Sequence, residues 1–230
     1  MEELVGTYTH TRYRDEEQDF LVGFLESNDT VTGPANPLPE PGMTYRFFGM
    51  WKTSPKYGKQ FKFVVFTSHE PHSRQAVCLY LEKMCKGTGL GKVAAMKLWD
   101  KYQSEAVAVL RLQPKRAAEE CGLDWSKCQE AADLLAKDAK REHTMVELVG
   151  LFSGRGFPAG TISACMDRWG SRGPGLIQRD PYLLLTNRIP GAGFSRCDAL
   201  YQSQGHDLGR MKRQVICGWH HIDTKSNGDT

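Results

Sequence analysis

The chain has 230 residues, of which 40% are hydrophobic, so it is long enough to bury an ordinary core in one large or two small domains. Its formal net charge of +3 identifies no partner, but residues 1–40 hold two arginines against nine acids, whereas residues 41–101 hold eleven lysines and arginines against three acids. Seven cysteines without a C-x-x-C pair argue against a disulfide framework or zinc ribbon, and no apolar run is long enough for a membrane span, so we expect a cytoplasmic protein without a membrane partner.

The first part of the chain, residues 1–72, predicts a small OB-like β-barrel. Short runs rich in β-branched and aromatic residues cover 5–11, 20–25, 45–51 and 61–67, and turn-rich stretches such as GPANPLPEPG separate them. The runs around Tyr45 and in FKFVVF combine aromatic and basic residues. That combination fits either a nucleic-acid-binding face or core aromatics flanked by solvated lysines.

Beyond Pro71 the composition becomes helical, and glycines separate the segments. Helices are expected at 74–84, 92–102, 128–142, 145–153, 160–169 and 194–203. The connections KGTGLGK, CGLDWS, GRGFPAG and PGAGFS all contain glycine, which gives a loose repeat of helix, tight turn and helix. The fold class is therefore expected to be α+β and multi-domain, with an all-α tandem helix-hairpin-helix domain over 73–205 and a linker or helix over 206–230.

Two of the glycine-rich connections predict contacts with DNA phosphates. In a helix-hairpin-helix unit the turn points backbone N–H groups at a phosphate, and the following helix N-terminus adds positive potential. Glycine permits positive φ and lets a phosphate approach the backbone. The candidate residues are Lys86, Gly87, Thr88, Gly89, Gly91 and Lys92 in the first loop, and Gly191, Gly193, Ser195 and Arg196 in the second, where Ser195 is a candidate N-cap. A purely structural turn between packed helices is the alternative for each loop.

The loop GTGLGKV does not satisfy the nucleotide-binding pattern G-x-x-x-x-G-K-[ST]. Lys86 stands where the first glycine is required, and Val93 stands where a hydroxyl would hold Mg²⁺. A helix is also expected before the loop in place of a strand. The segment ICGWHH offers too few ligands for zinc, so we expect no catalytic, metal or cofactor site.

These features together resemble the N-terminal region of RecD-like ATP-dependent DNA helicases. The segment GMWKTSPKYGKQFKF resembles a family signature of Gly and Trp ending one strand and a Tyr-Gly-x-Gln-Phe turn opening the next. KGTGLGKVAAMKL resembles the first hairpin of that family, and RDPYLLL with IPGAGFSRCDAL resembles the last. The second hairpin departs from the pattern because Asp124 and Trp125 follow Gly122, and SGRGFPAGT resembles a degenerate unit that serves packing.

The resemblance implies a non-catalytic, DNA-binding front region of a 5′ to 3′ helicase. The motor motifs are absent, so we expect a fragment that needs no cofactor itself, while ATP and Mg²⁺ serve the motor of the parent protein. The expected partners are single-stranded or forked DNA, held by its phosphate backbone, and the motor domains of the same polypeptide. The alternatives are a module that docks on the motor, a junction-binding protein resembling RuvA, and an intact enzyme of an unfamiliar class.

Overall fold

The computed structural model describes residues 1–226 except 35 and 37, without the side chains of Ala159 and residues 223–226. The chain divides into two compact units, Met1–His143 and Thr144–Thr230. The domain boundaries expected at residues 72 and 205 stay predictions.

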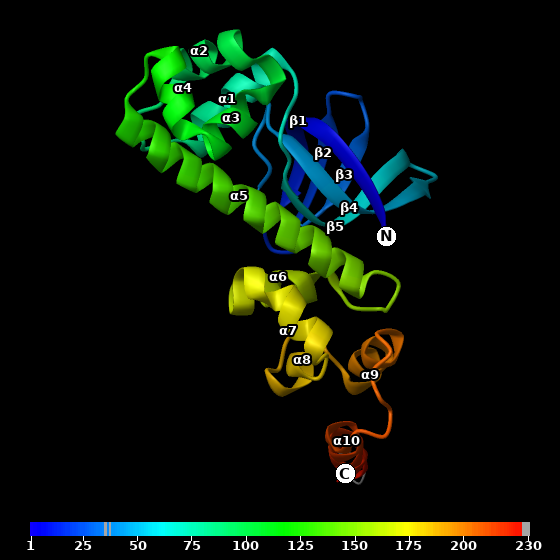
Figure 1. The fold of residues 1–230 in the computed structure, drawn as a ribbon. Helices are drawn as coiled ribbons and strands as arrows, with labels where there is room; N and C mark the ends of the chain where they lie inside the picture. Colours follow the sequence, from blue (N-terminus) through cyan, green and yellow to red (C-terminus); the bar gives the residue numbers. More distant parts are fainter. Residues whose placement is uncertain (35, 37, 227–230) are drawn as a thin grey trace. The chain divides into compact units, whose positions relative to one another are not determined.

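Five strands of the first unit form a closed barrel, so the expected α+β class with an N-terminal barrel is confirmed (Figure 1). The strands are β1 (Glu2–Asp15), β2 (Phe20–Leu25), β3 (Thr30–Gly33), β4 (Thr44–Ser54) and β5 (Gly58–Ser68), and their order around the barrel is β1-β2-β3-β5-β4. All neighbours are antiparallel except β3 and β5. Register shifts at Tyr8/His10 and Thr11/Tyr13 bend β1, which pairs with β4 through its first half and with β2 through its second.

Alternate residues of the strands fill the barrel, as expected for a sheet with one face turned inward. The largest of these side chains are almost fully buried and include Tyr8, Leu21, Phe47, Phe61 and Phe63. Their rings contact one another, with Phe47 and Phe63 centroids 5.1 Å apart. The aromatic residues of FKFVVF at 61 and 63 are therefore core residues, as one of the two interpretations of that run expected.

The first unit continues into a group of helices. They are α1 (Arg74–Met84), α2 (Lys92–Tyr102), the 3₁₀ turn η1 (Gln103–Glu105), α3 (Ala106–Leu112), α4 (Pro114–Cys121) and the start of α5 (Trp125–Phe152). The bounds predicted for 74–84 and 92–102 are confirmed. The separate helices predicted at 128–142 and 145–153 are wrong, because α5 runs through both. No glycine or proline interrupts it before Gly150, so nothing in the backbone breaks the helix there.

The second unit contains the end of α5 and the remaining helices. These are α6 (Ala159–Trp169), the 3₁₀ turn η2 (Gly170–Arg172), α7 (Gly173–Arg179), α8 (Leu183–Thr186), α9 (Phe194–Ser203) and α10 (Met211–Ser226). Buried apolar side chains from α5, α6, α7 and α9 form its core, including Leu148, Ile162, Ile177 and Leu200. Across the described part of the chain, no helix combines the length and the apolar character needed to cross a membrane.

Candidate nucleic-acid interface

In the turn between α1 and α2, two of the three glycines have the left-handed backbone that glycine favours, whereas the third, Gly91, has φ at −96°. Gly87 and Gly89 both have positive φ, at 96° and 80°. A Cβ atom added at Gly87 or Gly91 would meet nothing within 4 Å, so the backbone here is open to an approaching group. Lys86 and Lys92, which flank these glycines, are exposed. The turn therefore presents bare backbone between two cations.

Thr88 has a structural position within this turn. Its side chain is buried, and its hydroxyl donates a hydrogen bond to the Cys85 carbonyl at 2.8 Å and accepts one from the Leu90 N–H at 3.2 Å. Its own N–H donates to the Cys85 carbonyl at 3.1 Å. Of the six residues predicted in the first loop, Thr88 is thus the one that holds the turn together from inside.

The N-terminus of α2 receives no side-chain cap. Its N-cap residue is Gly91, whereas α1 is capped by Ser73, whose hydroxyl accepts a hydrogen bond from the Ala76 N–H at 3.3 Å. The first amides of a helix carry partial positive charge and need an acceptor from a side chain, water or a ligand. The start of α2 is accordingly a place where an anion can bind.

A second turn, between α4 and α5, lies beside the first and completes an open hollow of about 360 Å³. Three exposed lysines line this hollow, Lys92 and Lys97 from α2 and Lys127 from α5, and we call it the lysine hollow. The Lys127 side chain passes over Gly89, and its Cε lies 3.2 Å from the position that a Cβ of Gly89 would take. The absence of a side chain at Gly89 therefore makes room for a lysine from the other turn.

One acid also lines the lysine hollow. Asp124 accepts a hydrogen bond from the Lys127 N–H at 3.0 Å through its Oδ1, so it caps the N-terminus of α5. This carboxylate satisfies one amide in the first turn of α5 and repels an anion there. The charge of the hollow is thus concentrated at the α2 side, next to Gly89 and Gly91.

The second predicted loop, between α8 and α9, is used in part for packing. Gly191 has a φ of 78°, and a Cβ there would lie 2.2 Å from Pro158 Cγ. The Thr161 hydroxyl donates to the Pro190 carbonyl at 2.7 Å, which fixes the same contact. Gly191 therefore allows close packing against the turn before α6, and a phosphate has no access to it from that side.

The start of α9 differs from the prediction at its cap. Ser195 is not the N-cap, because the helix begins at Phe194 and Gly193 is the N-cap without a side-chain hydrogen bond. Gly193, Ser195 and Arg196 are exposed, and the Arg196 Nη1 donates to the Gly191 carbonyl at 2.9 Å. These three residues form the surface of the second loop, which belongs to a different unit from the lysine hollow.

Two lysines of the hollow were not among the predicted residues. Lys97 lies one and a half turns into α2, and Lys127 belongs to the hairpin whose glycine pattern is incomplete. The signal for Lys127 was its place at the start of a helix that follows Gly122, which has a left-handed backbone with φ at 58°. Only the packing of α4 and α5 beside α2 brings that lysine to Gly89.

The first loop does not fit ATP with Mg²⁺. Helix α1 precedes it, where a nucleotide-binding loop follows a strand, and the buried hydroxyl of Thr88 is engaged within the turn. Within the described residues, no group of three or more His, Cys, Asp and Glu side chains could hold a metal ion. Burial raises the pKa of the Cys85, Cys165 and Cys197 thiols to about 12, so these cysteines stay protonated and lack the thiolate that nucleophilic chemistry needs.

Comparison with known protein families gives a match for the barrel. Residues 1–71 match the family described as the OB-fold domain of the ATP-dependent DNA helicase YrrC. No curated protein and no solved structure matches the chain. The matched segment holds all five strands and ends before α1. The N-terminal barrel of this chain is thus similar to the OB-fold domain of a DNA helicase.

Proposed function

We propose that this chain is a non-catalytic, DNA-binding N-terminal region of a RecD-like 5′ to 3′ DNA helicase, and that the lysine hollow binds the phosphate backbone. The observation that carries the proposal is the uncapped start of α2 beside three exposed lysines. The match of residues 1–71 to a helicase OB-fold domain supports the same class of partner.

The chemistry of the hollow favours phosphate over a base edge. The amides at the start of α2 and the exposed backbone of Gly89 and Gly91 are donors without base specificity, and the ammonium groups act as point charges. Contacts of this kind fix the position of a nucleic acid without reading its sequence. We therefore expect binding that depends on salt and tolerates any sequence.

The remaining predicted residues have subordinate roles in this proposal. Lys86 and Gly87 contact the phosphate next to the one bound at α2, and Thr88 keeps the turn in shape. Gly193, Ser195 and Arg196 provide a further phosphate contact at the start of α9. The motor domains of the same polypeptide are the proposed protein partner, and ATP and Mg²⁺ bind to the motor alone.

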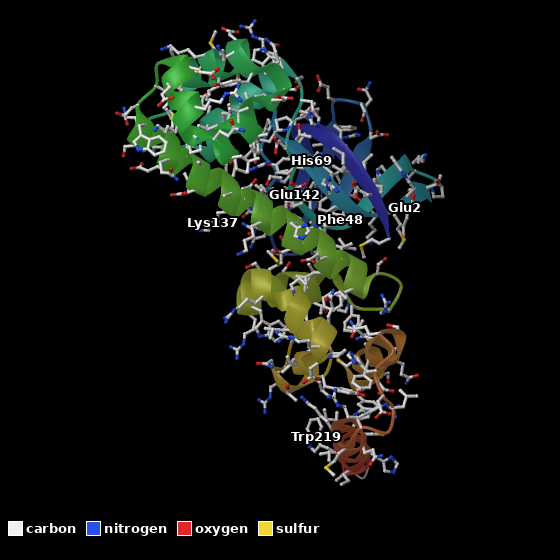
Figure 2. All side chains as sticks on the ribbon, in the orientation of Figure 1. Glu2, Phe48, His69, Lys137, Glu142 and Trp219 are labelled. Atoms are coloured by element: carbon white, nitrogen blue, oxygen red, sulfur yellow. The ribbon has the colours of Figure 1, made fainter. Side chains whose placement is uncertain are left out.

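A double charge reversal tests the proposal. Fluorescence anisotropy would compare the full chain with Lys92→Glu/Lys127→Glu on labelled single-stranded, duplex and forked DNA at two salt concentrations. We expect the variant to lose affinity for all three DNAs at least tenfold, because two phosphate contacts become repulsive. Lys137→Glu is the matched control, since Lys137 is an exposed lysine on α5 outside the hollow (Figure 2). Wild-type affinity in the double variant would instead favour a protein-docking module.

A further inference from the structure

The hairpin of β4 and β5 extends beyond the rest of the barrel. β1 pairs with β4 only from Thr44 to Gly49, and β3 pairs with β5 at Phe61 and Lys62. Residues 51–54 and 58–61 continue as pairs between β4 and β5, from Trp51 opposite Phe61 to Ser54 opposite Gly58. We call residues 50–62 the β4–β5 ribbon; it leads away from the closed sheet (Figure 1).

The charge of this ribbon has one sign. It carries four exposed lysines, Lys52, Lys56, Lys59 and Lys62, and the sequence has no acid between residues 41 and 69. The turns of the other two hairpins of the barrel are acidic: the turn between β1 and β2 carries four acids within residues 15–19, and the turn between β2 and β3 carries Glu26 and Asp29. Of these three hairpins, the β4–β5 ribbon is the one whose positive charge attracts a polyanion.

Aromatic rings lie among these lysines. Tyr57, at the tip, is 60% exposed. The ammonium group of Lys56 lies 5.0 Å from its ring centroid, and that of Lys59 lies 4.2 Å from the centroid of the Trp51 ring. The Trp51 ring in turn packs edge-on against the buried Phe61 at 5.2 Å. Cations and rings are thus already placed side by side on a firmly paired hairpin.

We infer that the β4–β5 ribbon binds unpaired nucleic acid, with a base stacked on Tyr57 and the neighbouring phosphates held by the four lysines. Base faces are available for stacking in a single strand, whereas a duplex buries them between neighbouring base pairs. An acidic protein segment would form ion pairs with the lysines, but it would have no base to stack on the exposed ring at the tip. The arrangement of ring and cations therefore favours a single strand over a folded acidic partner.

This inference shares its class of partner with the proposed function but uses a different surface. The lysine hollow contacts the backbone of any DNA, whereas the ribbon requires an unpaired base. The proposed function of the hollow and the inference about the ribbon can therefore be disproved independently. Loss of binding in the hollow variant tests the first, and discrimination between single-stranded and duplex DNA by Tyr57 tests the second.

The experiment measures the affinity of the full chain for a labelled oligothymidylate and for a labelled duplex of equal length. Tyr57→Ala is expected to weaken binding of the single strand roughly tenfold and to change duplex binding less than twofold. Tyr57→Trp should retain the affinity, because it keeps a ring. Tyr13→Ala is the matched control, since Tyr13 is 54% exposed but lies on β1 next to the acidic tip.

Photocrosslinking gives a second readout that does not depend on a change in affinity. Irradiation of the complex with oligothymidylate, followed by peptide mapping, should attach the strand to the segment that contains Tyr57. Unchanged single-strand affinity in Tyr57→Ala, or an equal loss for single strand and duplex, would overturn the inference. So would loss of binding in Lys52→Glu/Lys56→Glu with no effect of Tyr57→Ala, which would indicate that the ribbon contacts phosphates without stacking a base.

Discussion

Gly49 is a residue at which the barrel tolerates no side chain. It lies in β4 at a register shift, and an added Cβ would come within 2.1 Å of the Lys62 carbonyl oxygen and 2.6 Å of Phe63 Cα. Both obstacles are backbone atoms of β5, which cannot rotate aside as a flexible side chain can. The glycine therefore allows the close approach of the two strands.

Gly49→Ala is expected to destabilise the chain by about 3 kcal/mol, because the strands of the barrel must separate to admit the methyl group. Urea unfolding followed by circular dichroism measures this change. Gly150→Ala is the control, since a Cβ at that position on α5 meets nothing within 4 Å and should stabilise by roughly 0.5–1 kcal/mol. Equal stability of the two variants would contradict the explanation.

Asp198 on α9 is an acid that accepts hydrogen bonds from three other side chains. Its carboxylate accepts two hydrogen bonds from Arg213, at 2.8 and 2.9 Å, one from Gln202 at 2.6 Å, and a short one from the Tyr182 hydroxyl. The pKa of Asp198 lies below its ordinary value of 3.8, mainly because the Arg213 guanidinium donates hydrogen bonds to the carboxylate. The ion pair joins α10 to α9.

The lowered pKa of Asp198 determines how stability depends on pH. The carboxylate contributes stability fully above pH 3.8, and this contribution is lost as the pH falls through the lower pKa of the folded state. Asp198→Asn is expected to cost about 3 kcal/mol at pH 7, because it leaves Arg213 without its counter-charge. Thermal unfolding should show the two proteins converging as the pH falls below about 4. A constant difference from pH 7 to pH 2 would refute this account.

At the scale of elements, α5 joins the helical part of the first unit to the barrel. Asp138 on this helix accepts hydrogen bonds from the Ser68 hydroxyl at 2.9 Å and the Tyr80 hydroxyl at 2.8 Å. One turn further, Glu142 lies 2.7 Å from His69 Nδ1 (Figure 2). Burial, reinforced by the neighbouring Asp138 charge, raises the pKa of Tyr80, which therefore stays a hydroxyl donor at neutral pH.

Asp138→Asn is expected to destabilise the first unit by about 2 kcal/mol. An amide has a single acceptor oxygen for two hydroxyl donors, and its NH₂ group faces donors in place of acceptors. Chemical denaturation of the full chain measures the loss. Asp133→Asn should change the stability by less than about 0.5 kcal/mol, because Asp133 is exposed on the same helix. A similar loss of stability in both variants would show that the charge of α5 determines the stability and that the contact with the barrel does not.

The elements with a local signal could be predicted from the sequence. The bounds of α1, α2 and α9 follow from the Ser73 cap and from glycines just before the helices, and β2 follows from its run of apolar residues. β3 was not predicted, because TVTG has only four residues and its pairing with β5 is set by closure of the barrel. α3 and α4 are short helices separated by Gln113 alone, with Pro114 as the first residue of α4, and helix packing defines them more than sequence period does.

Only those parts of the candidate site that depend on neighbouring residues in the sequence could be predicted. The glycines before α2 indicated an open turn, and the positive φ angles of Gly87 and Gly89 agree with that expectation. The contributions of Lys97 and Lys127 depend on tertiary packing, which brings residues of two turns together. The inward position of the Thr88 hydroxyl and the packing of Gly191 against Pro158 depend on side-chain geometry that residue types do not reveal.

For the whole molecule, the helical segments of the two units repeat one arrangement. α2, η1 and α3 have 11, 3 and 7 residues, and α6, η2 and α7 have the same lengths. Glycines with positive φ precede both sets, at Gly87 and Gly89 and at Gly154 and Gly156. The first copy begins its helix with Lys92, whereas the second begins with Ala159 after the N-cap residue Pro158. The first copy therefore has the charge for a phosphate, and the second has a turn suited to packing.

Salt dependence of binding tests how the surfaces act together in the whole chain. The logarithm of affinity for a single strand should fall with the logarithm of salt concentration by about 0.7 for each phosphate contacted. If lysines of both the hollow and the β4–β5 ribbon contact phosphates, Lys92→Glu/Lys127→Glu and Lys52→Glu/Lys56→Glu should each reduce the slope by about 1.4. On duplex DNA only the hollow variant should reduce the slope, because the ribbon needs an unpaired base. Equal slopes for all proteins on both DNAs would mean that neither set of lysines contacts phosphate, whereas a reduction by one variant alone would identify the surface that does.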